Sequence, residues 1–204
     1  MGAAAERAGE IVEATSCDFT AQSMRLHDAP PFGSLVRVPH DDRELYGIVA
    51  ETRTASLEAG GRPIARGYGE VVDAAIYHEN PDLEHLLRTE FRALLVGFRA
   101  EGALRQHLPP LPPPLHYSVY ACSPLEIVAF TERLDYLRTL LAQPAAVADE
   151  LVAASARLAG TARGADGCER FLLRVGRELA ALLRDDYDRL TAVLRRLRPE
   201  EAHR

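Results

Sequence analysis

Residues 31–50 read Pro-Phe-Gly-Ser-Leu-Val-Arg-Val-Pro-His-Asp-Asp-Arg-Glu-Leu-Tyr-Gly-Ile-Val-Ala, and this stretch decides the fold class of the N-terminal half. Two apolar runs, 35–38 and 45–50, are separated by the polar turn residues 40–43. Short apolar runs between turn residues are typical of β-strands. Strands at this spacing predict a small closed β-barrel of about six strands, or a sandwich, over residues 10–122. Similar runs recur on either side, at 11–12, 71–72, 91–98 and 117–121.

A different hydrophobic period begins at Ser123. The sequence Ser123-Pro124-Leu125-Glu126 is a capping box with proline at the first helical position, which marks the start of a helix. Apolar residues then recur every three or four positions as far as Pro199. The chain is therefore predicted to be α+β, with a barrel followed by a helical C-terminal domain over 123–199. Residues 1–9 are small and polar, and we expect them to be disordered.

The C-terminal domain is predicted to contain about three helices. The first ends at Pro144, the second covers about 145–159, and the third runs from Asp166 to Pro199. The third helix would have roughly 30 residues and a length of about 45 Å. This is too long for one small core, so we expect its far end to contact a protein partner or a second copy of the chain. The predicted interface comprises Tyr187, Leu190, Val193, Leu194 and Leu197, with Phe32 and Tyr46 of the barrel as a weaker second surface.

The composition excludes several classes of enzyme. All 24 basic residues are arginine, and 30 acidic residues give a formal net charge of −6. Without lysine, a standard Walker A loop or a Schiff base cannot form. The cysteines Cys17, Cys122 and Cys168 are widely spaced, which predicts free thiols rather than a disulfide or a zinc site. We find no catalytic constellation and no cofactor or metal motif, and we predict a protein that is not an enzyme.

A short helix is predicted inside the barrel half, where Asn80-Pro81-Asp82 combines a capping residue with a proline. Two histidine–acid pairs, His78-Glu79 and Glu84-His85, flank this start. Because Pro81 prevents a continuous helix through both pairs, we expect exposed residues at helix ends rather than metal ligands.

Four arginines of the predicted third helix share one face. Arg170, Arg174, Arg177 and Arg184 follow the spacing i, i+4, i+7 and i+14. A basic face of this kind can contact phosphates, so a nucleic-acid-binding module is the alternative function. The acidic chain and the lack of interleaved aromatic residues favour a solvated face or a partner interface instead.

A proline-rich segment precedes the last predicted strand. Residues 108–115 read Leu-Pro-Pro-Leu-Pro-Pro-Pro-Leu, which forces a polyproline II conformation. We expect a stiff strap that packs on the barrel through Leu108, Leu111 and Leu115. A ligand for an SH3-type domain is the alternative.

The sequence shows no membrane or export signal. No apolar run approaches the roughly 20 residues of a membrane-spanning helix. The first ten residues contain two acids and no apolar segment, which predicts a cytoplasmic protein.

The barrel half resembles a known family. The first strand pair, residues 11–23, is followed by the Phe-Gly-Ser-Leu-Val-Arg-Val run ending at Val38 and by Leu-Tyr-Gly-Ile-Val ending at Val49. This pattern resembles the HAS barrel shared by HerA-type hexameric DNA translocases and the N-termini of rotary ATP synthase subunits. Gly33 and Gly47 stand where the strands of such a barrel must turn or bend. The proline-rich strap and residues 128–137 resemble the stand-alone bacterial members of this family.

The resemblance implies a role in assembly. In HerA-type proteins the barrel precedes a motor domain, whereas here helices follow at once and no Walker motif is present. In HerA complexes the barrel ring receives the NurA-type nuclease. The resemblance therefore implies an accessory or scaffold protein in a HerA/NurA-type DNA end-processing assembly. It would bind a HerA-type ATPase, a NurA-type nuclease or both, and it would contact nucleic acid only indirectly.

Overall fold

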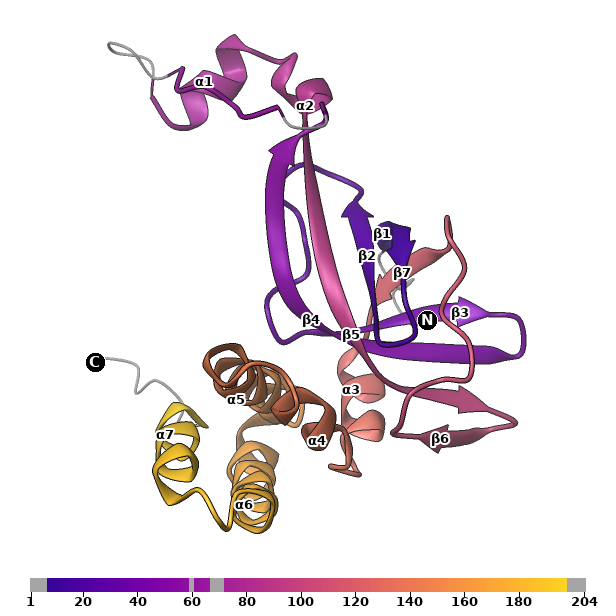
Figure 1. The fold of residues 1–204 in the computed structure, drawn as a ribbon, viewed down its shortest axis with the longest axis vertical. Coiled ribbons are helices and arrows are strands. Elements are labelled where there is room, and N and C mark those ends of the chain that lie inside the picture. Colours follow the sequence, from indigo (N-terminus) through magenta and orange to yellow (C-terminus); the bar gives the residue numbers. More distant parts are fainter. Residues whose placement is uncertain (1–6, 59–60, 67–71, 198–204) are drawn as a thin grey trace.

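The computed structural model describes residues 7–58, 61–66 and 72–197 (Figure 1). Seven strands in these residues form one antiparallel sheet in the order β2-β1-β7-β3-β4-β5-β6. Because β2 also pairs with β5, the first six strands in this sheet order close into a barrel. This confirms the predicted barrel and makes the sandwich alternative wrong. The strands are β1 (Arg7–Ala14), β2 (Asp18–Ser23), β3 (Leu35–His40), β4 (Arg43–Ser56), β5 (Leu87–Ala100), β6 (Ala103–Arg105) and β7 (Ser118–Ala121).

The described helices fall into two groups at opposite ends of the long β4–β5 ribbon (Figure 1). α1 (Ala74–Glu79) and α2 (Leu83–Leu86) lie between these two strands in the sequence. α2 confirms the short helix predicted after Pro81. The other five form one group beside the barrel. They are α3 (Pro124–Phe130), α4 (Tyr136–Leu141), α5 (Ala145–Thr161), α6 (Gly164–Leu182) and α7 (Tyr187–Leu197). In this group α4 and α5 contact β5 and β4, respectively, and α6 and α7 pack on α5. None of the helices in the described ranges is long and apolar enough to span a bilayer.

Two strand predictions need correction. β1 begins at Arg7, so residues 7–9 are not disordered, and Gly9 pairs with both Ser23 and Val119. The run at 71–72 was expected to form a strand, but Val72 lies in a turn that leads into α1. Residues 1–6, Val71 and Pro199 lie outside the described part of the chain.

Residues 45–50 of β4 and 93–98 of β5 are buried on both faces, because they separate two cores. Leu45 and Val49 of β4 point into the barrel, where they join Phe19, Phe91 and other apolar residues. The alternate residues Tyr46, Ile48 and Ala50 point outward and are covered by the helices. The register of the β4–β5 pair shifts beside Gly47, where Val96 has no partner on β4. Such a bulge changes which residues of a strand face inward.

Gln106 fixes the helices to the barrel. Its buried side-chain amide donates to the carbonyl oxygens of Phe130 (2.7 Å) and Arg133 (3.2 Å), and its carbonyl oxygen accepts from the Tyr136 N–H (3.2 Å). These bonds provide hydrogen-bond partners for backbone groups between the end of α3 and the start of α4. The single helix predicted from 123 to Pro144 is therefore two helices, and its predicted start at the Ser123 capping box is confirmed.

The predicted third helix also breaks. α6 ends at Leu182, and Asp186 then accepts a hydrogen bond from the Arg189 N–H (3.1 Å), as a capping residue does at a helix start. α7 turns back onto α5, where Arg189 Nε pairs with Asp149 Oδ1 at 2.8 Å. The break removes the reason to expect a helix end that projects beyond the domain.

The prolines and leucines of the proline-rich strap differ in burial. Pro109 and Pro113 are buried, whereas Leu108, Leu111 and Leu115 are exposed, so the predicted leucine contacts are wrong. A polyproline II segment has three residues per turn, which places Leu108 and Leu111 on the same side. That side faces solvent.

Gly33 allows the loop before β3 to approach α5 closely. Its φ is +87°, and a Cβ placed there would lie 2.7 Å from the Ala154 Cβ and 2.8 Å from the Ser155 nitrogen of α5. Its N–H donates to the Val49 carbonyl at 2.8 Å. The loop before β3 therefore contacts both β4 and α5.

We expect Gln106→Leu to lower the free energy of unfolding by about 3 kcal/mol, because the buried backbone groups of Phe130 and Tyr136 and the partly buried Arg133 carbonyl lose their partner. Urea unfolding followed by circular dichroism measures this loss. The control Gln22→Leu, at an exposed position of β2, should change stability by less than about 0.5 kcal/mol. Equal effects of the two variants would contradict the role given to Gln106.

The variants Gly33→Ala and Gly102→Ala measure the cost of backbone strain separately from the cost of steric overlap with α5. Both glycines have positive φ, but a Cβ at Gly102 meets nothing within 4 Å. Gly102→Ala should lower stability by about 1 kcal/mol through its backbone alone. Gly33→Ala should lower it by about 3 kcal/mol, because α5 must also move. The same urea titration tests both, and losses of equal size would show that α5 does not limit position 33.

Candidate functional site

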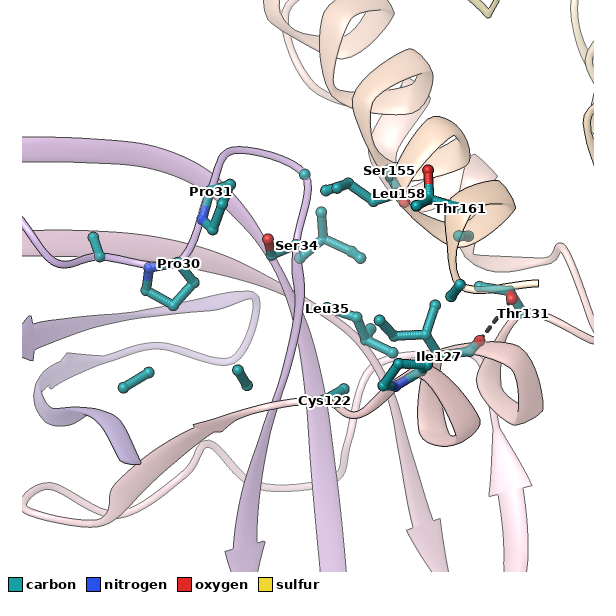
Figure 2. Close-up of a pocket in the computed structure, with 18 of the residues that line it drawn as sticks. Pro30, Pro31, Ser34, Leu35, Cys122, Ile127, Thr131, Ser155, Leu158 and Thr161 are labelled. Atoms are coloured by element: carbon teal, nitrogen blue, oxygen red, sulfur yellow. Dashed lines mark hydrogen bonds between the residues drawn. The ribbon is translucent and has the colours of Figure 1, made fainter. Parts of the chain in front are cut away.

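A cleft of about 460 Å³ lies where the barrel meets the helices (Figure 2). In that view Pro30 and Pro31 stand on one side, Leu158 and Thr161 of α5 on the other, and Leu35 and Cys122 between them. Its walls come from the β2–β3 loop, the start of α3 and the C-terminal half of α5. The lining is mainly aliphatic, and in the described residues it includes Met24, Ala29, Pro30, Pro31, Leu35, Ile48, Pro124, Ile127, Leu158, Ala159 and Ala162.

Both walls of the cleft are held in place by hydrogen bonds. On the loop side, the Val49 N–H donates to the Ser34 carbonyl (3.0 Å), next to the Gly33 contact with α5. On the helix side, Arg163 Nη1 donates to the Ala159 carbonyl (2.8 Å) and Arg174 Nη2 to the Thr131 carbonyl (2.8 Å). Preformed, mostly apolar pockets of this size are typical of small-molecule sites.

The polar groups of the cleft are few. Ser34, Ser155, Thr131 and Thr161 contribute hydroxyls, and the Thr131 hydroxyl donates to the Ile127 carbonyl (2.6 Å; Figure 2). The charged lining residues of the described chain are Arg7, Arg25 and Asp28, and all three come from the barrel side. In the described residues, the helix side of the cleft therefore carries hydroxyls but no charge, and the charges stand on the barrel side only.

A network of charged and polar groups lies behind the cleft wall. Arg37 pairs with Glu44 through Nη1 (2.9 Å) and with Glu126 through Nε (2.8 Å). The Tyr46 hydroxyl donates to Glu44 Oε2 (2.6 Å), and Arg99 Nε approaches the same hydroxyl at 3.4 Å. The network joins β3, β4, β5 and α3.

The surroundings set the protonation of three groups near this network. Burial, followed by the nearby Glu126 charge, raises the pKa of the Cys122 thiol well above its ordinary value. Burial and the bond to Glu44 raise the pKa of Tyr46. Burial alone would raise the pKa of Glu126, but hydrogen bonds from Ser123 and the Arg37 charge hold it below its usual value. Cys122 therefore stays a thiol at neutral pH and is a poor nucleophile.

A second apolar cavity, of about 450 Å³, lies at the far end of the β4–β5 ribbon. It belongs to the tip module, which we define as the described residues 57–58, 61–66 and 72–86. Ile64 is 80% exposed, and its apolar neighbours Leu57, Tyr77 and Leu86 are also exposed. Sequence reasoning did not find this surface, because its apolar residues follow no single period.

The tip module is tied to the barrel through His27. The His27 ring bonds the Tyr77 hydroxyl of α1 (2.8 Å), and the His27 backbone N–H donates to the Thr89 hydroxyl of β5 (2.8 Å). Thr54 of β4 bonds the same threonine hydroxyl (2.8 Å). These residues are far apart in sequence, so no sequence pattern signals the cluster.

The predicted interface residues do not form one surface. Tyr46, Val193 and Leu197 are buried in the helix-side core, and Leu190 packs partly against it. These residues are covered because α7 packs on α5 and Tyr46 faces the helices. Phe32, Leu194 and Tyr187 remain exposed, with Tyr187 at 75%.

The four arginines of the predicted basic face are not aligned either. Arg184 lies beyond the end of α6 and pairs with its neighbour Asp185 (3.2 Å). Arg170 Nε bonds the Asp166 carbonyl (3.2 Å), and Arg174 is held by Thr131 and by Glu132. Only Arg170, Arg174 and Arg177 share a helix, so the geometry gives little support to phosphate binding.

The histidine–acid pairs lie at exposed positions, as predicted. His78 and Glu79 belong to α1, and Glu84 and His85 belong to α2. Within the described ranges, no three histidine, cysteine, aspartate or glutamate side chains gather as metal ligands.

Comparison with known protein families matches no family, and comparison with curated proteins matches none of them.

The Glu126 environment predicts a specific dependence of stability on pH. A carboxyl whose pKa is lowered on folding stabilises the protein above its unfolded pKa of about 4.3, and this contribution is lost as the pH falls through the lower folded value. Glu126→Gln removes it. The wild type should therefore lose unfolding free energy more steeply than Glu126→Gln between about pH 5 and pH 3.

Urea unfolding at several pH values measures this slope. Glu169→Gln, at an exposed position of α6, is the matched control and should keep the wild-type slope. A Glu126→Gln variant with the wild-type slope would contradict the stabilising role of the carboxylate.

Proposed function

We propose that this chain is a non-enzymatic assembly subunit of a HerA/NurA-type translocase–nuclease. A HAS-like barrel carries the tip module, and the tip module docks onto the partner. The observation that carries the proposal is the exposed apolar surface of the tip module at the end of the β4–β5 ribbon (Figure 1). Contiguous exposed apolar patches of this kind mark interaction sites.

The tip module has the form of a docking element. The ribbon carries it beyond the barrel ring, on the side opposite the C-terminal helices (Figure 1). Residues 51–54 of the ribbon are exposed, so a partner can approach the module without displacing the barrel or the helices. The bonds of His27 to Tyr77 and Thr89 connect the module to the barrel.

The charge of the tip module defines the chemistry of the partner. Its described residues carry two arginines, Arg62 and Arg66, and five exposed acids, which gives a net charge of −3. A complementary partner surface has an apolar centre and arginine or lysine at its rim. The acids are Glu58, Asp73, Glu79, Asp82 and Glu84.

The choice of partner rests on the sequence resemblance. The closed six-stranded barrel agrees with a HAS barrel in its general form. In HerA-type assemblies this barrel is the docking element for the nuclease. An accessory chain with such a barrel and no motor domain would join the same assembly.

Co-purification with the HerA-type ATPase and the NurA-type nuclease of the same organism tests the proposal. We expect a complex whose mass, measured by light scattering after gel filtration, includes this chain. The double variant Ile64→Asp with Leu86→Asp should weaken the complex at least about tenfold, because two apolar contacts become desolvated charges. Higher salt should weaken the wild-type complex as well.

The control places the same substitutions on the helical side. Leu125→Asp with Leu173→Asp changes two exposed leucines of α3 and α6 and should leave binding unchanged. Circular dichroism should show an intact fold for both double variants. Absence of a complex with either partner would overturn the proposed function. Loss of binding only in Tyr187→Asp with Leu194→Asp would move the docking surface to α7.

A further inference from the structure

We infer that the cleft between the barrel and α5 binds an aliphatic carboxylate, with the alkyl chain against α5 and the carboxylate at Arg25. The site is separate from the tip module, and this inference does not depend on the proposed function. It rests on the shape of the cleft, the chemistry of its lining and the placement of its charges.

The space in the cleft comes from small side chains held apart by fixed contacts. Ser155, Ala159 and Ala162 line it on α5, and Ala121 lines it at the end of β7. The direct contact of Gly33 with α5 prevents the loop from closing over these residues. A cleft that is kept open in this way needs little rearrangement to take a ligand.

The lining selects an aliphatic ligand. The described lining residues include no phenylalanine, tyrosine or tryptophan, so an aromatic ligand would find no ring to stack on. Leu35, Ile48, Ile127 and Leu158 provide branched aliphatic walls instead. Burial of an alkyl chain there contributes about 0.8 kcal/mol for each methylene group.

The charges select an anionic end group. Arg7 is already paired with Glu10 (2.7 Å), whereas Arg25 has no ion pair within the described chain. The Arg25 guanidinium can therefore bind a ligand carboxylate through two parallel hydrogen bonds. Asp28 lines the same side and would repel that carboxylate, which makes the sign of the end group a direct test.

Titration of the full chain with decanoate, below its micelle concentration, tests the inference. We expect saturable one-to-one binding by calorimetry, with shifts of the Ser155, Ala159 and Ala162 amide signals in NMR spectra. Arg25→Gln should weaken binding about tenfold, because one charge-assisted interaction is lost. Arg184→Gln removes the same charge from an exposed turn outside the cleft and should leave decanoate binding unchanged.

A second pair of variants tests the location by size. Ala162→Phe fills the cleft and should abolish binding. The matched variant Ala180→Phe, at an exposed position of α6, should bind decanoate as the wild type does. Thermal unfolding without ligand shows whether each variant is folded.

Two further probes decide the ligand class. Decanol, with the same chain and no charge, should bind more weakly than decanoate, and decylammonium more weakly still. Tighter binding of decylammonium would make Asp28 the anchor and overturn the assignment of a carboxylate. Binding of decanoate that survives Ala162→Phe, or no binding by the wild type, would overturn the site itself.

Discussion

The double burial of β4 and β5 is the constraint on which the rest of the structure depends. A strand with one apolar face can close a barrel, but its outer face then stays in water. Here residues 45–50 and 93–98 are buried throughout, because the inner side chains fill the barrel and the outer ones form the floor of the helical domain. Burial of both faces stabilises barrel and helices together, because the helix-side core includes the outer residues of the barrel wall.

Several local features follow from this shared wall. The bulge at Val96 and the glycine at position 47 adjust which side chains face each core. Gln106, just after β6, bonds backbone groups between α3 and α4. The chain can therefore bend there and follow the barrel surface. Gly33 allows the loop before β3 to contact α5. The cleft is the space that remains beside that contact.

The sequence predicted the elements better than their arrangement. The Ser123 capping box and the apolar run from Leu45 to Ala50 act through neighbours in sequence, and both were read correctly. The break at Asp186 was missed, because the leucine period continues through it, although Asp186 caps the start of α7. Tyr46 was assigned to a surface because a lone strand pattern does not tell whether helices cover its outer face.

The cleft could not be predicted, since its walls come from the β2–β3 loop, α3 and α5, which no sequence period relates. β4 connects this cleft to the tip module, because Ile48 lines the cleft and Ser56 lines the tip cavity. Energetic coupling between two sites needs an element that has two arrangements. Residues 45–50 are buried on both faces, and a tightly packed element of this kind has no room for a second arrangement. Residues 51–54 have exposed side chains, but they stay paired with residues 89–92 of β5, and Thr54 bonds Thr89. The part of β4 between the cleft and the tip module is therefore held by strand pairing along its length, which favours two sites that bind independently.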